Sequence, residues 1–276
     1  RLFVSAFLDW VVMNDLAWSA LVLPVRGIAR RSFGLEFDEL MCLGCSVVRR
    51  FDASPHVSIS FDDSPRPDTT SELLEALAQY NTKATFFVIG DHARRYPDIV
   101  RKIQADGHEI GNHTQHHRDL HRVSPRLLAR EILQCQRTLQ EILGARPKLF
   151  RAPYGHFRWD MRDRARLGSI EALVGWDVAP PYAESDPELI ADYVLERVRP
   201  GSIILLHDGL SGVGGAISKG AGRAAAASLH LIIPELQRRG LMTVPIGQQL
   251  ADFAGAPHRS PAPVRHPLFG VASPYA

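Results

Sequence analysis

Short apolar runs alternate with amphipathic stretches along most of the chain. In the first apolar run, Val57, Ile59 and Phe61 alternate with serines, which is the period of a half-buried β-strand. Residues 70–80 then have helical spacing, and a second apolar run follows at residues 84–89. This repeated order of strand and helix predicts parallel strands joined by helical crossovers.

The same pattern gives the expected elements over the rest of the region. Strands are expected at residues 56–61, 84–89, 109–111, 148–151, 172–176, 202–206 and 241–244. Helices are expected at residues 70–80, 91–106, 124–143, 187–198 and 221–239. Ser124-Pro125 marks one helix start, and Gly144 and Gly240 mark two helix ends. About seven parallel strands favour an α/β fold whose sheet closes, or nearly closes, into a barrel.

Both ends of the chain lack this pattern. Residues 2–25 are strongly apolar but contain Asp9 and Asp15, and an aspartate at a membrane centre costs about 2.5–3.5 kcal/mol. A helix packed on the domain is therefore favoured, and membrane association through this segment is the alternative. No basic region and cleavage site frame it as a signal peptide. The expected organisation is an apolar segment with an irregular connector at residues 1–52, one domain at 53–252, and a poorly ordered Pro/Ala-rich tail at 253–276.

Charge balance and cysteine content give no support for a nucleic-acid partner or for a structural zinc site. The 276 residues include 32 Lys and Arg against 30 Asp and Glu, so no electrostatic argument for a nucleic-acid partner arises. Cys42 and Cys45 have CxxC spacing, but no second pair completes a structural zinc site. The 12 histidines are numerous, and several of them lie between His108 and His121.

Two adjacent carboxylates, Asp62 and Asp63, end the first predicted strand. Neighbouring carboxylates repel, and burying both is costly unless a cation or a hydrogen-bond network holds them. In isolation, an exposed Asp-Asp turn would explain this motif. At a junction of strand and loop, however, the two side chains point in different directions and can take different partners.

A histidine cluster follows the third predicted strand. His113 and His117 are four residues apart, so in a helical turn both imidazoles would lie on one face, as in a two-histidine metal site. His116 is an alternative partner for His113 at a spacing of three. Alone, such a pair is more often a surface or capping feature.

Polar or aromatic residues also stand at the carboxyl ends of other predicted strands, namely Arg151, Trp176 and His207. The carboxyl ends of parallel strands meet on one face of a barrel, where active sites are built. One carboxylate and two imidazoles leave coordination positions open on a divalent metal, which is typical of a catalytic site. The pattern therefore predicts metal-assisted hydrolysis of an acyl group, with the second carboxylate as base.

Four motifs, in this order, resemble those of the polysaccharide deacetylase family, also called the NodB-homology or carbohydrate esterase family 4 group. They are Phe61-Asp62-Asp63-Ser64-Pro65, His113-Thr114-Gln115-His116-His117, Arg151-Ala152-Pro153-Tyr154-Gly155 and Leu205-Leu206-His207. The likeness runs from about residue 56 to residue 250, so residues 53–252 would be the catalytic domain. It implies a distorted (β/α) barrel with seven strands, and a divalent metal, zinc first and cobalt or nickel as alternatives. It also implies removal of N-acetyl groups from amino sugars, or of O-acetyl groups in some members.

The resemblance also implies roles for the matching residues. Asp62 would be the general base, and Asp63 would bind the metal together with His113 and His117. Arg151 would orient Asp62 and keep it ionised.

Further roles follow for the residues around this centre. The backbone N–H of Tyr154 would stabilise the oxyanion, and His207 would protonate the departing amine. The residues expected to contact the substrate are Pro153, Trp176, Tyr182 and Leu205, of which Leu205 would line the acetyl pocket.

The chain departs from the family at two positions. Ser64 stands where the first motif usually has glycine, and a positive φ there would cost a serine on the order of 1 kcal/mol. After Trp176 the family commonly has Asp-Trp, which tunes the acid histidine, whereas this chain aligns Tyr182 and Ala183 there. The carboxylates that could replace the missing one are Asp177, Glu184 and Asp186.

The sequence therefore predicts a metal-dependent enzyme that removes N-acetyl groups from a peptidoglycan- or chitin-like glycan. An O-acetyl ester or other non-peptide amide hydrolase is the first alternative. A catalytically impaired, metal-retaining glycan-binding protein is the second. The family resemblance suggests an extracytoplasmic or cell-envelope location, although no export signal is visible.

Overall fold

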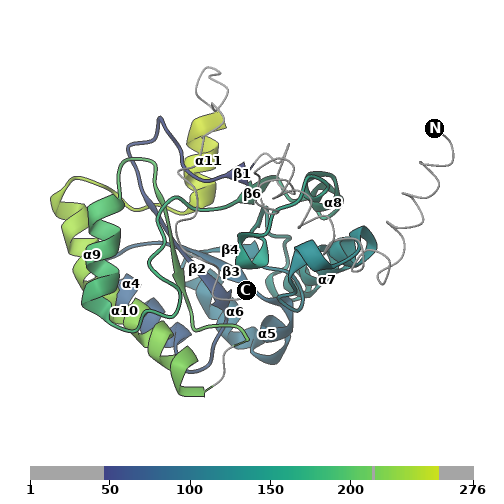
Figure 1. Ribbon diagram of the computed structural model, residues 1–276, viewed down its shortest axis with the longest axis horizontal. Helices are drawn as coiled ribbons and strands as arrows, with labels where there is room; N and C mark the ends of the chain where they lie inside the picture. Colours follow the sequence, from purple (N-terminus) through teal and green to yellow (C-terminus); the bar gives the residue numbers. More distant parts are fainter. Residues whose placement is uncertain (1–46, 213–214, 255–276) are drawn as a thin grey trace, which may run out of the picture.

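The computed structural model describes residues 47–212 and 215–254, arranged as one curled parallel sheet with helices packed around it (Figure 1). The strands are β1 (Val47–Val48), β2 (Ser58–Ser64), β3 (Thr85–Val88), β4 (Glu109–Asn112), β5 (Leu149–Phe150), β6 (Ala172–Val174) and β7 (Ile203–His207). The helices are α4 (Thr70–Gln79), α5 (Gly90–Arg95), α6 (Pro97–Ala105), α7 (Pro125–Leu143), α8 (Met161–Leu167), α9 (Pro187–Arg197), α10 (Gly215–Arg238) and α11 (Ile246–Ala254). Two 3₁₀ turns, η1 (Leu120–Arg122) and η2 (Pro153–Gly155), lie in the loops.

The sheet has seven strands in the order β1-β6-β5-β4-β3-β2-β7, and every strand pair is parallel. Its two edges approach each other just after β1. Arg50 forms a bridge with Ser202, and the Phe51 N–H donates to the carbonyl of Gly201 at 2.9 Å. The predicted α/β fold, a distorted barrel with about seven parallel strands, is confirmed.

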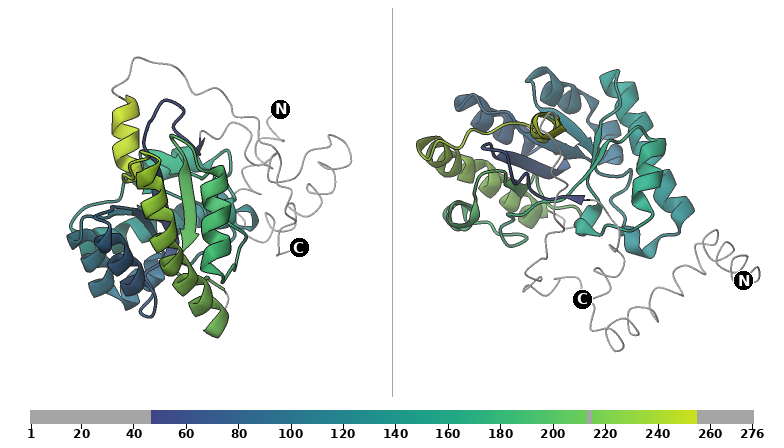
Figure 2. Two further views of the ribbon diagram at one scale, coloured as in Figure 1. Left: turned by 90° about the vertical axis from the view of Figure 1, so that its left-hand side faces the viewer. Right: turned by 90° about the horizontal axis from the view of Figure 1, so that it is seen from above.

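Apolar side chains fill both faces of the sheet. Every residue of β2 is buried, as expected for a strand that is covered on both sides. Helices α4, α9 and α10 lie along one flank of the curled sheet, and α7 and α8 lie along the other flank (Figures 1 and 2). Cys135 and Leu139 of α7 share a core with residues of α4, α9 and α10, so both groups cover the outer face of the sheet. Helix α11 covers the end of the barrel where the strands begin, because the Ile246 N–H donates to Thr85 and the Gly247 N–H to Glu109. The opposite end, where the strands finish, carries the candidate site.

Two expected elements differ from the structure. Residues 241–244 do not form a strand of the sheet, since Thr243 makes a single bridge to Val57. The pairing goes no further because the next N–H that could donate to β2, that of Ile246, donates to the Thr85 hydroxyl instead. The seventh strand is instead β1, Val47–Val48, which pairs with β6 inside the segment expected to be an irregular connector. A strand of two residues is too short for a periodic pattern to reveal.

The helix expected at 91–106 is two helices, α5 and α6, which are divided at Tyr96-Pro97. Pro97 occupies the first turn of α6, where its missing N–H costs nothing, but it cannot continue α5. The predicted start of α7 is confirmed, because the Ser124 hydroxyl accepts the N–H of Leu127. Its predicted end is confirmed too, because Gly144 has a φ of 76°.

Several expectations fall on residues outside the described ranges. They are the apolar segment at 2–25, the Cys42/Cys45 pair, most of the connector, and the tail beyond residue 254. Within the described residues, no helix combines the length and apolar character that crossing a bilayer requires.

Candidate active site

The two adjacent carboxylates lie at the carboxyl end of β2, beside the end of β7. Asp62 is in register with His207 on β7, and both Asp62 and Asp63 are buried. Asp63 has a φ of 70°, so its side chain leaves the strand in a direction that an extended residue would not give. Strained backbone of this kind is typical of functional sites.

One oxygen of Asp63 lacks a hydrogen-bond donor. Its Oδ2 accepts the N–H of Ser211 at 2.7 Å, whereas no donor among the described residues reaches its buried Oδ1. Nε2 of His117 lies 3.2 Å from this Oδ1, and Nε2 of His113 lies 3.7 Å from it. An unpaired buried carboxylate oxygen is costly, and a cation held between this oxygen and the two ring nitrogens would satisfy it. The donor set of one carboxylate and two imidazoles therefore fits a divalent metal.

His113 is held in the tautomer that a metal ligand needs. Its Nδ1 donates to the carbonyl of Arg151 at 2.9 Å, which leaves the lone pair on Nε2, the nitrogen that faces Asp62 and Asp63. Burial lowers the pKa of His113 to about 4, so the ring is neutral near pH 7. Burial alone would raise the pKa of Asp63. Electrostatic interactions with His117, His207 and His113 outweigh burial and hold this pKa below its ordinary value.

His117 reaches the cluster through an irregular loop. The expected helical turn between His113 and His117 is wrong, since Thr114 and His117 have φ values of 68° and 54°. The loop is fixed by the Thr114 hydroxyl, which accepts the N–H of His117 at 3.0 Å. The structure places His116 elsewhere, with its Nδ1 2.8 Å from the carboxylate of Glu131.

Arg151 lies fully buried against Asp62. Its Nη1 donates to Asp62 Oδ1 at 2.8 Å and to the Ser60 hydroxyl at 2.9 Å, and Nη2 donates to the carbonyl of Gly175. The guanidinium also stacks on the Phe87 ring, 4.0 Å from its centroid. Because the arginine is held on several sides, it fixes the orientation of the Asp62 carboxylate.

The residues expected at the substrate side lie around this centre. Tyr154, in η2, has a φ of 60° and a ring centroid 4.8 Å from that of His117. A Cβ atom at Gly155 would lie 2.8 Å from the indole of Trp176, so only glycine lets the loop and this ring approach so closely. The Tyr182 ring meets the His207 ring edge-on at 5.4 Å. Two other expected contact residues are buried: Leu205 on β7 and Pro153 in η2.

The carboxylates that could replace the missing family aspartate all have local partners. Asp177 accepts the Ile203 N–H at 2.8 Å and the Ser202 hydroxyl, so it secures the start of β7. Glu184 accepts the backbone N–H of Asp186, and Asp186 caps α9. The described ring neighbour of His207 is Tyr182, the residue that aligns with the missing aspartate.

Two contacts of Asp63 could not be foreseen from the sequence. One is the N–H of Ser211, and the other is the His92 ring, whose Nδ1 lies 3.2 Å from the Asp63 carbonyl. A backbone donor leaves no sequence signal, and a lone histidine within a helical stretch is not distinctive. A positive φ at Ser64 would have cost stability, but the positive φ falls on Asp63 instead, so the serine carries no such cost.

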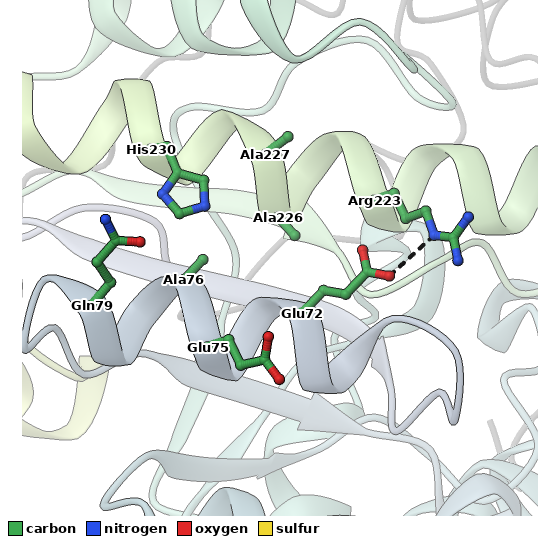
Figure 3. Close-up of a pocket in the computed structure, with 8 residues that line it drawn as sticks. All are labelled: Glu72, Glu75, Ala76, Gln79, Arg223, Ala226, Ala227 and His230. Atoms are coloured by element: carbon green, nitrogen blue, oxygen red, sulfur yellow. Dashed lines mark hydrogen bonds and ion pairs between the residues drawn. The ribbon is translucent and has the colours of Figure 1, made fainter.

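A separate groove lies on the outer surface between α4 and α10, and none of the expected site residues lines it (Figure 3). An ion pair between Glu72 and Arg223 crosses it at 3.1 Å. The groove therefore has no part in the site.

Comparison with known proteins agrees with this geometry. The family model described as polysaccharide deacetylase matches residues 51–172. A chitooligosaccharide deacetylase of a Bradyrhizobium species is 37% identical over 196 residues, covering 70% of this chain and 89% of that protein. A peptidoglycan-N-acetylglucosamine deacetylase of Bacillus cereus is 32% identical over 197 residues, covering 70% of this chain and 87% of that protein.

The fold is shared with solved structures too. The crystal structure of a peptidoglycan N-acetylglucosamine deacetylase superposes with a TM-score of 0.66 at 30% identity, covering 74% of this chain and 91% of that one. The motifs, the curled parallel sheet and these relatives lead to one conclusion: the chain belongs to the polysaccharide deacetylase family.

Proposed function

We propose that the protein removes N-acetyl groups from an amino-sugar polysaccharide or oligosaccharide, chitin-like or peptidoglycan-like, and that it needs a divalent metal. The observation that carries the metal requirement is the donorless Oδ1 of Asp63, which faces the Nε2 atoms of His113 and His117. The substrate class is supported by the relatives, which are named as chitooligosaccharide and peptidoglycan deacetylases. Zinc suits this donor set, and cobalt or nickel are the alternatives.

Asp63, His113 and His117 would hold the metal. When bound, a divalent ion there lowers the pKa of water and polarises an acyl oxygen. A neutral His113 needs no proton loss before binding, because burial already depresses its pKa.

Asp62 would act as the general base. Arg151 fixes one oxygen of its carboxylate, and the other oxygen lies 3.6 Å from Nε2 of His113, on the side of the metal ligands. From there Asp62 can take the proton of the water that attacks the acetyl carbon.

His207 would act as the general acid. It lies in register with Asp62 on the neighbouring strand, so acid and base come from adjacent strand ends. It would give its proton to the amine as the carbon–nitrogen bond breaks, so that acetate and a free amino sugar leave. The backbone N–H of Tyr154 would stabilise the oxyanion, and Pro153, Trp176, Tyr182 and Leu205 would contact the sugar and its acetyl group.

We assign this catalytic domain to residues 53–252, with β1 added at its N-terminal side because it completes the sheet. A peptidoglycan-like substrate would place the reaction in the cell envelope. Membrane association through the apolar segment at 2–25 is not favoured.

Acetate release decides between this function and its alternatives. Purified protein is incubated with acetylated chitooligosaccharides, with peptidoglycan fragments and with an O-acetyl ester, each with zinc or with a chelator. The expected result is chelator-sensitive release of acetate from an N-acetylated glycan. Release from the ester alone would favour an O-acetyl esterase. Glycan binding without release from any substrate would favour a binding protein.

A further inference from the structure

A buried carboxylate beside the site, Asp208, has no part in the chemistry proposed above. It directly follows His207 at the end of β7, and its side chain is fully buried. Successive side chains along an extended strand point to opposite faces, so Asp208 points away from the face that His207 takes. It points toward the segment that joins β2 to α4.

Three hydroxyl groups from that one segment donate to Asp208. The Thr69 hydroxyl bonds to Oδ1 at 2.6 Å, the Ser64 hydroxyl bonds to Oδ2 at 2.9 Å, and the Thr70 hydroxyl also bonds to Oδ2. The Thr70 hydroxyl in turn accepts the N–H of Arg66 at 2.7 Å, which directs its own proton toward Asp208. Despite these donors, burial raises the pKa of Asp208 to about 7.

The two segments joined by Asp208 are those that carry the catalytic carboxylates and the acid histidine. Ser64 directly follows Asp63, and the N–H of Asp208 donates to the carbonyl of Asp62 at 2.9 Å. Three residues beyond Asp208, the N–H of Ser211 donates to Asp63 Oδ2 at 2.7 Å. A shift of the loop after β7 relative to the loop after β2 would therefore move the Asp63 carboxylate.

We propose that Asp208 is a positioning residue that locks these two loops together. By holding the Ser64, Thr69 and Thr70 hydroxyls, it sets the distance between Asp63 and the Ser211 N–H. It thereby keeps the donorless oxygen of Asp63 aimed at the two histidines, and keeps His207 at the same centre. This role rests on the function proposed above.

Ser64, one of the two departures from the family pattern, gains an explanation. Its backbone needs no positive φ, and its side chain supplies one of the three hydroxyls on Asp208. The serine therefore adds a hydrogen bond between the loop after β2 and the loop after β7.

A second carboxylate, which is half-buried, gives a control for simple stabilisation. Glu109, at the start of β4, accepts the Thr85 hydroxyl at 2.8 Å and the Gly247 N–H at 2.9 Å. Burial raises its pKa as well. Because it lies at the opposite end of the strands, its loss should affect stability without moving the site.

The test compares Asp208→Asn, Glu109→Gln and Ser64→Ala with the wild type. Zinc affinity is measured by chelator competition, kcat and KM on an acetylated chitooligosaccharide, and stability by thermal unfolding. Asp208→Asn is expected to lower both zinc affinity and kcat by about 10–100-fold, the usual cost of removing an outer support of a metal ligand, with KM little changed. Glu109→Gln should lower the unfolding temperature and leave zinc affinity and kcat unchanged. The zinc affinity and kcat of Ser64→Ala should fall between those of Asp208→Asn and Glu109→Gln.

Equal effects of Asp208→Asn and Glu109→Gln on zinc affinity and kcat would overturn the proposal. If Asp208→Asn does not fold, Ser64→Ala decides, and wild-type zinc affinity and kcat in that variant would overturn the proposal too. A wild-type protein that binds zinc but releases no acetate would refute the proposed function, while the zinc affinities would still test the role of Asp208.

Discussion

The described part of the molecule contains two clusters of the same composition, each with one aspartate and two histidines whose donor atoms lie within 4.8 Å of one another. The site cluster comprises Asp63, His113 and His117, and the loop cluster comprises Asp119, His121 and His156. The two clusters differ in what their nitrogen and oxygen atoms already bind.

In the loop cluster the polar atoms bind one another and the backbone. Nδ1 of His156 lies 2.8 Å from Asp119 Oδ1, and Nε2 of His121 bonds to the carbonyl of Phe157. The two rings stack in parallel at 4.4 Å, so their in-plane lone pairs cannot converge on one ion. The Arg122 guanidinium, 3.2 Å from the other Asp119 oxygen, already supplies a positive charge. This arrangement is a hydrogen-bonded support for the loop.

In the site cluster an acceptor has been left without a donor. Asp63 Oδ1 is buried and unpaired, and the backbone bond at Nδ1 of His113 turns Nε2 toward it. The comparison shows that composition and proximity do not identify a metal site. What distinguishes the site cluster is an unpaired buried oxygen that faces two ring nitrogens, and this feature supports the metal proposed there.

The largest expected difference in zinc affinity is that between the two variants in which the aspartate of one cluster is substituted. Asp63→Asn should lower zinc affinity by more than about 100-fold, since even the loss of an outer support of a metal ligand costs 10–100-fold. Asp119→Asn, the matched variant, should leave zinc affinity and stoichiometry unchanged. Equilibrium dialysis with metal analysis checks both. Equal loss of zinc in the two variants would remove the distinction between the clusters.

Asp62→Asn should separate catalysis from metal binding within the site. Because Asp62 is held by Arg151 and Asp63 faces the ligands, the variant should keep its zinc and lose about 10²–10⁴-fold in kcat, the usual contribution of a general base. Acetate release and metal content are measured on the same preparation. Loss of zinc would instead mean that the two aspartates have exchanged roles.

His116→Ala sharpens the assignment within the histidine motif. Its ring contacts Glu131, 2.8 Å away, so zinc affinity should stay close to that of the wild type. Chelator competition measures this affinity, and a drop of about tenfold or more would make His116 a ligand.

The smallest expected effect is a change in how the stability of the fold depends on pH, and it comes from Asp208. Its pKa is raised from 3.8 to about 7 in the folded protein, so between these values the folded chain holds a proton that the unfolded chain has lost. The contribution of Asp208 to stability is therefore full below about pH 4 and declines as the pH rises through about 7. Asp208→Asn should flatten this decline in denaturant unfolding measured at several pH values. An unchanged slope would show that Asp208 does not titrate in this range.

Much of the fold could be predicted because its strands and helices have clear periods. The runs around Ile59 and Ile204 and the long helix from Pro125 show strong patterns with marked ends. The strand Val47–Val48 was missed because two residues carry no period. The break at Pro97 was missed because apolar spacing continues across it.

The candidate site residues could be identified from the sequence because each lies at or just after the end of a strand. The carboxyl ends of parallel strands lie at the same edge of the sheet. The orientation of these residues could not be predicted. His117 reaches the cluster through positive φ values and a threonine hydroxyl, which spacing along the chain does not encode. The partners of Asp177 and the link between Ser64 and Asp208 join residues far apart in the sequence, so only the folded structure reveals them.

The proposed function requires one metal at the site cluster for deacetylation. Chelator-treated protein is titrated with zinc while acetate release from an N-acetylated chitooligosaccharide is followed. The expected result is no release without metal and full activity at about one equivalent per chain, with no recovery in Asp63→Asn and normal recovery in Asp119→Asn. Full activity of the metal-free protein, or recovery that depends on Asp119 and not on Asp63, would contradict it.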